Sequence, residues 1–200
     1  MTSLEQVQAL WDAAQAKFGR VDVWINNAGL AHSDVPFWEQ PASVMHDVVS
    51  VNVLGVMHGS KVAVLGMAAQ GSGAIYNFEG FGSNGRTRFG LGVYGSTKAA
   101  ERFFTRSLAL DVKTKGLPVQ IGSISPGIVI TDLVTGQYAG REQEFTRARR
   151  VFNILGDKVE TVTPFIADKV LAGETNIQWL TGAKVMWRFA TAGFSKRQIV

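Results

Sequence analysis

Tyr94 and Lys98 are the residues whose types and spacing could do chemistry together. They lie four positions apart in the segment "VYGSTKAAERFF", so on a helix they share one face. A free phenol has a pKa of about 10, but a neighbouring ammonium favours the phenolate and lowers that pKa. Such a pair can exchange a proton with a carbonyl compound. An isolated pair of this kind is more often a surface tyrosine beside a solvated lysine, because the pattern is common by chance.

Three other motifs accompany this pair along the chain. The segment "NNAG" at 26–29 ends an apolar run, Asn52 lies in a long apolar segment, and "SPG" at 125–127 is followed by Thr131. In this order and spacing, up to about residue 135, the chain resembles the short-chain dehydrogenase/reductase family. Members of that family are NAD(P)(H)-dependent oxidoreductases with a Rossmann-type fold.

The resemblance implies a role for each matching residue. Tyr94 would be the general acid/base, Lys98 would lower its pKa and bind the nicotinamide ribose, and Asn52 would hold a water in a proton relay. Tyr94 and Lys98 are also implied cofactor contacts, and the others lie along the adenosine half and at the nicotinamide: Asn27, Ala28, Gly29, Pro126, Gly127, Ile128 and Thr131. NADP(H) is expected in preference to NAD(H). Asn52 could instead be a polar group inside a helix, and Ser-Pro-Gly could be only a turn.

The loop before the tyrosine departs from the family pattern, which has a catalytic serine there. Glu79 and Gly80 occupy the usual serine places, and Ser83 is the nearest hydroxyl. A flexible glycine loop could bring Ser83 to the site, so it is the candidate replacement. An ionised Glu79 beside Tyr94 would raise the pKa of the phenol, so a strand-end role for Glu79 is favoured over a substrate contact.

This departure indicates a branch of the family. The segments "NFEGFGSNG" and "VFNILGDKVETV" resemble the chlorophyll(ide) b reductases, which reduce a formyl group on a tetrapyrrole with NADPH. The stretch "GFGSNG" also matches G-x-G-x-x-G. It is followed by a loop rather than a helix, and no acidic residue ends a following strand, so we interpret it as a chance match to the dinucleotide fingerprint.

Helical and strand patterns alternate along the chain. Such alternation predicts an α/β fold with parallel strands joined by helices. Helices are expected at 4–18, where Ser3 and Gly19 mark the ends, and at 43–69, 93–116 and 141–152. Strands are expected at 21–29, 73–79 and 118–127, and the tail is expected to add one more strand and helix. We expect one domain over 1–200, with a substrate-side extension at 136–200.

The resemblance also implies an incomplete Rossmann-type doubly wound sheet. The family begins with two β-α units, of about 30 residues each, that carry a TGxxxGxG turn, and neither is present in this sequence. The strand at 21–29 would then form an apolar sheet edge open to pairing, and we expect marginal stability and weak cofactor binding. A misassigned start, a fragment and a truncated protein remain as explanations.

Composition limits the other possibilities. The 200 residues, 46% of them hydrophobic, suit one globular domain, and a net charge of +4 is too small to indicate nucleic-acid binding. The absence of cysteine excludes disulfides and thiol catalysis, and the three histidines show no metal-ligand spacing. No secretion signal or run of about 20 apolar residues is evident, so a cytoplasmic location is expected.

Partners follow from these interpretations. We expect a small-molecule carbonyl substrate and a homodimer or homotetramer, because the helices at 43–69 and 93–116 correspond to the family's usual dimer interface. The basic-aromatic tail "AKVMWRFATAGFSKR" could lie on a membrane, but a packing helix is favoured. The alternative to an enzyme is a non-catalytic remnant that serves as a binding or oligomerisation module.

Overall fold

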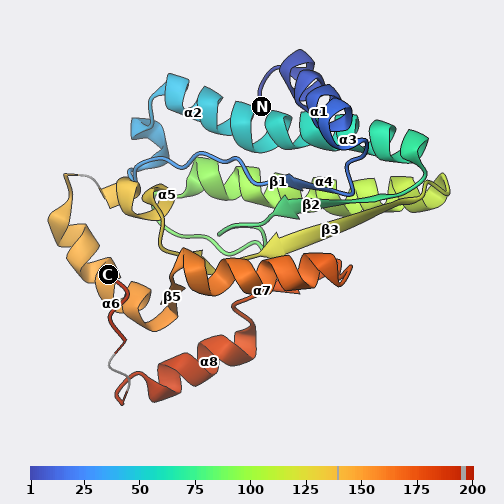
Figure 1. The fold of residues 1–200 in the computed structure, drawn as a ribbon. Helices are drawn as coiled ribbons and strands as arrows, with labels where there is room; N and C mark the ends of the chain where they lie inside the picture. Colours follow the sequence, from blue (N-terminus) through green and yellow to red (C-terminus); the bar gives the residue numbers. More distant parts are fainter. Residues whose placement is uncertain (139, 195–196) are drawn as a thin grey trace. The chain divides into compact units, whose positions relative to one another are not determined.

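The computed structural model describes residues 1–138, 140–194 and 197–200 (Figure 1). It divides into two compact units, Met1–Ile124 and Ser125–Val200, and each is described by itself. The expected division, one domain with an extension from residue 136, stays a prediction.

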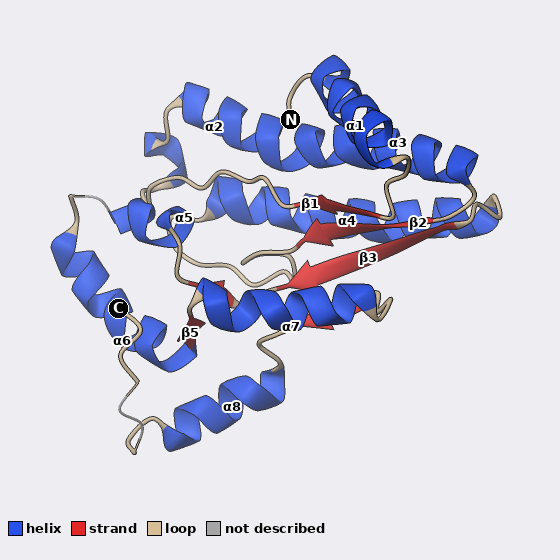
Figure 2. Cartoon of the chain, in the orientation of Figure 1, coloured by secondary structure: helices blue, strands red, loops and turns tan. Residues whose placement is uncertain are grey.

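A parallel sheet forms the centre of the first unit (Figure 2). Its strands lie in the order β1 (Val23–Asn26), β2 (Gly73–Phe78) and β3 (Val119–Ser125). Trp24 pairs with Ile75, which pairs in turn with Ile121. Helices join these parallel strands, as parallel pairing requires, so the predicted Rossmann-like α/β fold is confirmed. Within the first unit β1 pairs with β2 alone, and it forms the sheet edge that the sequence predicts.

The helices of the first unit begin and end close to the predicted positions. They are α1 (Leu4–Phe18), α2 (Ala42–Val49), α3 (Gly55–Gln70) and α4 (Gly92–Thr114), with the 3₁₀ turn η1 (Phe37–Glu39) and the π-helical turn η2 (Ser50–Leu54). The Ser3 hydroxyl accepts the N–H of Gln6 at 3.3 Å, and Gly19 has a φ of 79°, so both ends of α1 are capped as expected. The single helix predicted at 43–69 is the run α2, η2 and α3.

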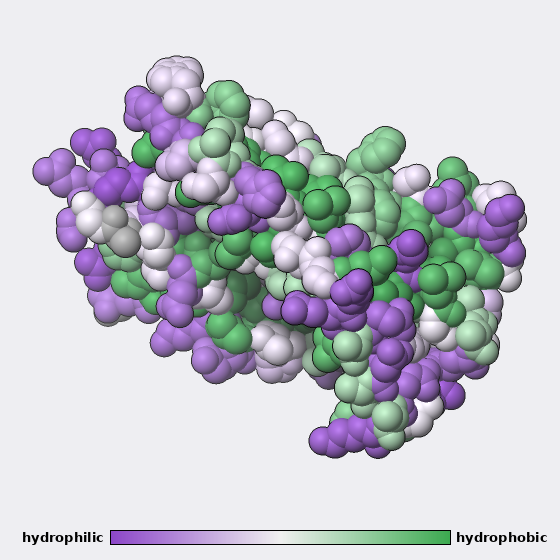
Figure 3. Space-filling model, turned by 90° about the horizontal axis from the view of Figure 1, so that it is seen from above, coloured by the Kyte–Doolittle hydropathy of each residue, from purple (hydrophilic) through white to green (hydrophobic). Residues whose placement is uncertain are grey.

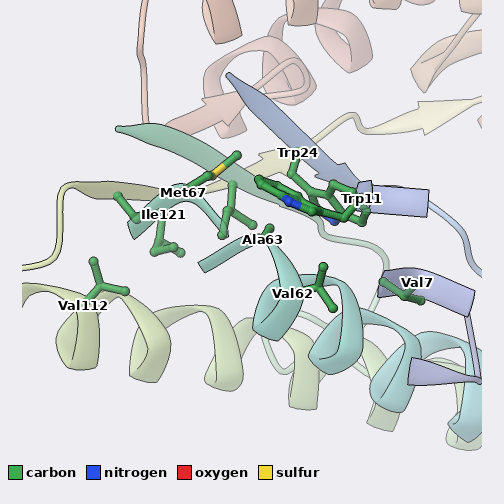
Figure 4. Close-up of a cluster of buried hydrophobic side chains, with 10 residues drawn as sticks. Val7, Trp11, Trp24, Val62, Ala63, Met67, Val112 and Ile121 are labelled. Carbon is green, nitrogen blue, oxygen red and sulfur yellow. The ribbon is translucent and has the colours of Figure 1, made fainter. Parts of the chain in front are cut away.

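A core of apolar side chains packs between α1, α3, α4 and the sheet (Figure 4). The ring centroids of Trp11 and Trp24 lie 6.0 Å apart. A Cβ on Gly66 would lie 2.1 Å from the Trp11 ring, so glycine is what allows α1 to approach α3 there. The buried members of this core are Val7, Trp11, Trp24, Val62, Ala63, Met67, Ile75, Val112, Val119 and Ile121.

Some apolar side chains of this unit remain exposed. Leu10, Phe18 and Leu65 are exposed on α1 and α3, and Phe103 and Leu110 are exposed on α4. Figure 3, which views the chain from above Figure 1, shows hydrophobic residues between hydrophilic ones on the face that it presents.

One helical run is long and apolar enough to cross a membrane. It extends over Ala42–Gln70, and an 18-residue window within it has a mean hydropathy of 1.5. His46, Asp47 and Lys61 interrupt the run, so it reaches the limit by its average hydropathy and not as an unbroken stretch of about 20 apolar residues, which the sequence was predicted to lack. The physical reason is that a core helix needs the same composition: Val62, Ala63 and Met67 of this run are buried in the core of the first unit. Length and composition alone are therefore weak evidence for a membrane span.

The second unit contains a two-stranded parallel pair and several helices. The pair is β4 (Ile128–Val129) with β5 (Gly156–Asp157), and the other elements are α5 (Asp132–Thr135), η3 (Gly136–Tyr138), α6 (Glu142–Leu155), α7 (Val159–Leu171), β6 (Asn176–Gln178) and α8 (Gly182–Thr191). The predicted helix at 141–152 and the tail strand and helix are confirmed, whereas α7 was not predicted. Lys196, in the basic-aromatic tail, lies outside the described residues.

Candidate active site

The start of α4 positions Tyr94 and Lys98. No side chain of the N-cap residue caps this helix, and the Nε2 atom of His32 instead accepts the backbone N–H of Tyr94 at 3.0 Å. His32 is buried and belongs to the loop that follows β1. It thus satisfies one of the unpaired N–H groups of the first helical turn. Sequence reasoning considered His32 only as a metal ligand and missed this role.

The glycine loop after β2 packs directly on this helix start. Gly82 has a φ of 103°, and a Cβ there would lie 2.5 Å from the Cα of Gly95. A Cβ on Gly80 would lie 2.5 Å from the Tyr94 hydroxyl oxygen. The loop backbone therefore borders the phenol, and the place where the family has a serine leaves no room for a side chain unless Tyr94 shifts.

Ser83 anchors this loop to α4. Its hydroxyl accepts the N–H of Gly80 at 3.0 Å and donates to the backbone carbonyl of Lys98 at 3.1 Å. Because the hydroxyl proton goes to that carbonyl, donation to a substrate oxygen requires the hydroxyl to release the Lys98 carbonyl. The catalytic role expected for Ser83 stays a prediction.

Asn52 lies in the π-helical turn η2 and is completely buried. Its Oδ1 accepts the N–H of Leu30 at 2.7 Å, and its Nδ2 donates to the Leu30 carbonyl at 2.9 Å and to Thr97 Oγ1 at 3.0 Å. It thus connects the loop after β1 to α4. Single π-turns are frequent at functional sites. The water-relay role of Asn52 stays a prediction, and the sequence did not predict the π-turn.

The ammonium of Lys98 is fully engaged inside the protein. Its three N–H donors face Glu101 Oε2 at 2.8 Å, Glu101 Oε1 at 3.1 Å and the Phe78 carbonyl at 3.2 Å. Lys98 Nζ lies 5.8 Å from the centre of the Tyr94 ring. Tyr94 and Lys98 lie on one helix, as their four-residue spacing predicts, whereas Glu101, the direct partner of the lysine, was not predicted.

The pKa of Tyr94 is shifted in the direction opposite to the expected one. Burial raises it to about 12, and the negative charge of Glu101 adds to the rise. The lowering expected from Lys98 is absent because the ammonium is paired with a carboxylate, so the phenol lies beside a nearly neutral pair. The pKa of Glu101 is itself raised to about 7, mainly by burial, and the charge of Lys98 opposes that rise.

Glu79 takes a structural position at the end of β2. Its Oε1 lies 3.5 Å from Nε of Arg102 on α4, and its backbone N–H donates to the Ile124 carbonyl at 2.7 Å. The charge of Arg102 therefore partly balances that of Glu79 near the tyrosine.

The residues expected along the cofactor fall in both units. Asn27 and Ala28 are exposed just after β1, and Gly29 is half-buried, with a Cβ there lying 3.4 Å from Asn52 Oδ1 and 3.9 Å from Lys98 Nζ. The others, Pro126, Gly127, Ile128 and Thr131, belong to the second unit, and Gly127 has a φ of 74° with its Cα packed on Leu180. Gly29 is thus brought next to Asn52 and Lys98, and the contacts of both groups with a cofactor stay predictions. No cluster of metal-ligating side chains occurs among the described residues.

Comparison with known sequences gives consistent matches. The family described as short chain dehydrogenase matches residues 1–142. A protein of Oryza sativa subsp. japonica named chlorophyll(ide) b reductase NOL, chloroplastic, is 32% identical over 205 residues, which cover 97% of this chain and 58% of that protein. The acetoacetyl-CoA reductase of Cupriavidus necator is 33% identical over 130 residues, covering 65% of this chain and 51% of the relative. The chain thus spans little more than half the length of these relatives.

Solved structures give the same fold. A short chain dehydrogenase/reductase from Burkholderia phymatum in complex with NAD has a TM-score of 0.76 at 24% identity, covering 100% of this chain and 76% of that structure. A gluconate 5-dehydrogenase from Burkholderia cenocepacia in complex with NADP and tartrate has a TM-score of 0.63 at 25% identity, covering 74% of this chain and 57% of that structure.

Proposed function

Since this chain belongs to the short-chain dehydrogenase family, we propose that it is an NAD(P)H-dependent reductase of a carbonyl group on a bulky substrate. The observation that carries the proposal is the gathering of Tyr94, Lys98, Asn52 and Gly29 at the carboxyl end of β1 and the start of α4. In open parallel sheets, ligands bind beyond the carboxyl ends of the strands.

The residues at the carboxyl end of β1 and the start of α4 fit a nicotinamide cofactor. Asn27 and Ala28 are exposed beyond the end of β1, and bare backbone at Gly29 borders Asn52 and Lys98. Asn27 to Gly29 would follow the adenosine half of the cofactor, Lys98 would bind the nicotinamide ribose, and residues 126–131 would contact the nicotinamide. NADP(H) is proposed in preference to NAD(H), because this chain resembles the plant chlorophyll(ide) b reductases over nearly its whole length and that resemblance implies NADPH.

Tyr94 would supply the proton for the reduction. The cofactor, when bound, supplies the hydride that adds to the carbonyl carbon. The Tyr94 hydroxyl gives its proton to the carbonyl oxygen, which leaves an alcohol product and a phenolate. At neutral pH the phenol is protonated and can donate its proton, but burial raises its pKa to about 12 and so makes it a weaker acid than a free phenol.

We further propose that the substrate carbonyl is a formyl group on a tetrapyrrole. The support is the 32% identity to the rice chlorophyll(ide) b reductase over 97% of this chain, together with the glycine loop at 80–85. The plant relatives are named chloroplastic, and the cytoplasmic location expected for this chain stays a prediction.

Replacing Tyr94 with phenylalanine tests this role. Tyr94→Phe should lower kcat for NADPH-dependent reduction of chlorophyllide b by about 10²- to 10⁴-fold, because the proton donor is lost. Loss of NADPH absorbance measures turnover, and cofactor fluorescence measures NADPH binding, which should change little. Tyr138→Phe removes a hydroxyl from the second unit and should keep wild-type turnover. Unchanged turnover in Tyr94→Phe would remove Tyr94 as the acid.

The alternative, a non-catalytic module that oligomerises, has its own support. Phe103 and Leu110 of α4 and Leu65 of α3 are exposed apolar side chains on two helices that correspond to the family's usual dimer interface. Light scattering on the eluting chain would measure its mass. A stable dimer that neither binds NADPH nor reduces any carbonyl tested would favour this alternative over the enzyme.

A further inference from the structure

Glu101 is a buried carboxylate that the proton transfer described above does not use. Its side chain is 3% exposed, and it lies one turn beyond Lys98 on the buried face of α4. Burying a charge is costly unless it is paired. Lys98 provides the pairing through two contacts, at 2.8 and 3.1 Å.

The pairing determines where the ammonium of Lys98 can act. Two of its N–H groups face the Glu101 carboxylate and the third faces the Phe78 carbonyl, so no donor remains for Tyr94 or for a ribose hydroxyl. Lys98 can serve the reaction only after at least one of these contacts is released. A neutral carboxylic acid would hold the ammonium much less firmly than a carboxylate does.

Titratable and charged groups from three segments surround the Lys98–Glu101 pair. On α4 they are Tyr94 and Arg102, and from the end of β2 Glu79 approaches and pairs with Arg102. His32, from the loop after β1, binds the backbone N–H of Tyr94 through Nε2 and so contributes an acceptor there. Glu101 is thus the charge that cancels the lysine beside the phenol.

We propose that Glu101 is a positioning residue whose ionised carboxylate holds Lys98 away from the Tyr94 hydroxyl, and whose protonation releases Lys98 to assist proton transfer. The proposal rests on the proposed function, because it concerns the same site. Reduction should then be faster when Glu101 is neutral, since a free ammonium beside Tyr94 makes the phenol a stronger acid.

The pKa shifts agree with this arrangement. The pKa of Glu101 is raised to about 7, first by burial, so the carboxyl changes its charge near neutral pH. The pKa of Tyr94 is raised to about 12, first by burial and then by Glu101. Below pH 7 Glu101 loses its negative charge, so it no longer raises the pKa of Tyr94 as strongly, and the phenol becomes easier to ionise.

Carbon-13 NMR of the tyrosine rings tests the coupling without cofactor or substrate. The chain has three tyrosines, so Tyr94→Phe assigns the Tyr94 signal, which reports the pKa of that phenol. Glu101→Gln should lower the pKa of Tyr94 by about one to three units, because the lysine charge is no longer cancelled. Asp111→Asn removes the same charge from an exposed site near the other end of α4 and should leave that pKa unchanged. Equal pKa values in Glu101→Gln and the wild type would overturn the proposal.

A wild-type measurement covers the case in which Glu101→Gln fails to fold. The Tyr94 signal of the wild type should move in a first step near pH 7, when Glu101 gains its proton, and the absence of such a step would also overturn the proposal. Neither readout needs turnover, so the two proposals can fail separately. A chain that shows both NMR effects but no reductase activity would contradict the proposed function and support the coupling of Glu101 to Tyr94. A chain that is active but shows neither NMR effect would contradict the coupling and support the proposed function.

The pH profile of kcat distinguishes the positioning role of Glu101 from a merely structural role, because a structural role would leave the profile unchanged. Wild-type reduction should slow as pH rises through about 7, whereas Glu101→Gln should show no such step. A step that persists in Glu101→Gln at the same pH would contradict the assignment to Glu101.

Discussion

Asp157 in the second unit and Glu101 in the first are both buried carboxylates, yet their pKa values shift in opposite directions. Asp157 accepts hydrogen bonds from Arg188 at 2.8 and 3.1 Å, from Arg197 at 2.7 Å and from Trp179 at 2.6 Å. Burial alone would raise its pKa, but these donors together lower it. Glu101 has Lys98 as its charged donor, and a second carboxylate, Glu79, lies nearby. Burial therefore outweighs the effect of Lys98, and the pKa of Glu101 is raised.

The difference shows how the number of donors decides whether a buried acid is fixed or titratable. Two guanidinium groups and an indole keep Asp157 ionised throughout the neutral range, so its role is to hold α8 and the tail to β5. One ammonium is not enough to offset the desolvation of Glu101. A carboxyl whose charge changes near neutral pH can influence a neighbouring reaction, whereas a permanently ionised one can only support the structure.

Removing a partner of Asp157 should give the largest effect. Arg188→Met leaves a buried carboxylate with fewer donors and should lower the free energy of unfolding by about 3–5 kcal/mol. Denaturant titration measures this change, and Arg147→Met, at an exposed position of α6, is the control that should change little. A loss below about 1 kcal/mol in Arg188→Met would mean that Asp157 does not depend on this network.

The pH dependence of stability should have opposite signs at the two acids. The pKa of Glu101 is raised from 4.5 to about 7, so its contribution is fully present below pH 4.5 and is lost as pH rises through 7. Relative to Glu101→Gln, the wild type should lose about 3 kcal/mol of unfolding free energy across this range. The pKa of Asp157 is lowered from 3.8, so its contribution is present above pH 3.8 and is lost as pH falls further.

Denaturant titrations of the wild type, Glu101→Gln and Asp157→Asn at several pH values measure both effects. The wild type and Glu101→Gln should diverge between pH 4.5 and 7, and the wild type and Asp157→Asn should converge only in acid. Parallel curves for the wild type and Glu101→Gln would show that Glu101 does not titrate in the folded chain.

The elements and the reactive pair could be predicted because their signals are local. Ser3 and Gly19 mark the ends of α1, and the four-residue spacing of Tyr94 and Lys98 places them on one face of α4. α7 was missed because Pro164 stands inside it, next to β-branched residues that disfavour a helix.

The partners of the site could not be predicted in the same way. His32 binds the N–H of Tyr94 across 62 positions of the chain, a contact that no local pattern reveals. Glu101 had a usable signal, because it continues the buried stripe of Thr97, Lys98 and Thr105 on α4. A charged pair three residues apart is ordinarily a solvated surface pair, and it is buried here only by the tertiary packing of other elements on α4.

The most direct test of the proposed reaction is the transfer of deuterium from NADPH labelled at the reactive carbon of its nicotinamide. The chain would be incubated with this cofactor, with both deuterium stereoisomers tried, and with chlorophyllide b, and the hydroxymethyl product would be examined by mass spectrometry. We expect one deuterium in the product from one of the two isomers with the wild type, and almost no product with Tyr94→Phe. Product formed without deuterium from either isomer, or formed equally well by Tyr94→Phe, would contradict hydride transfer at a site centred on Tyr94.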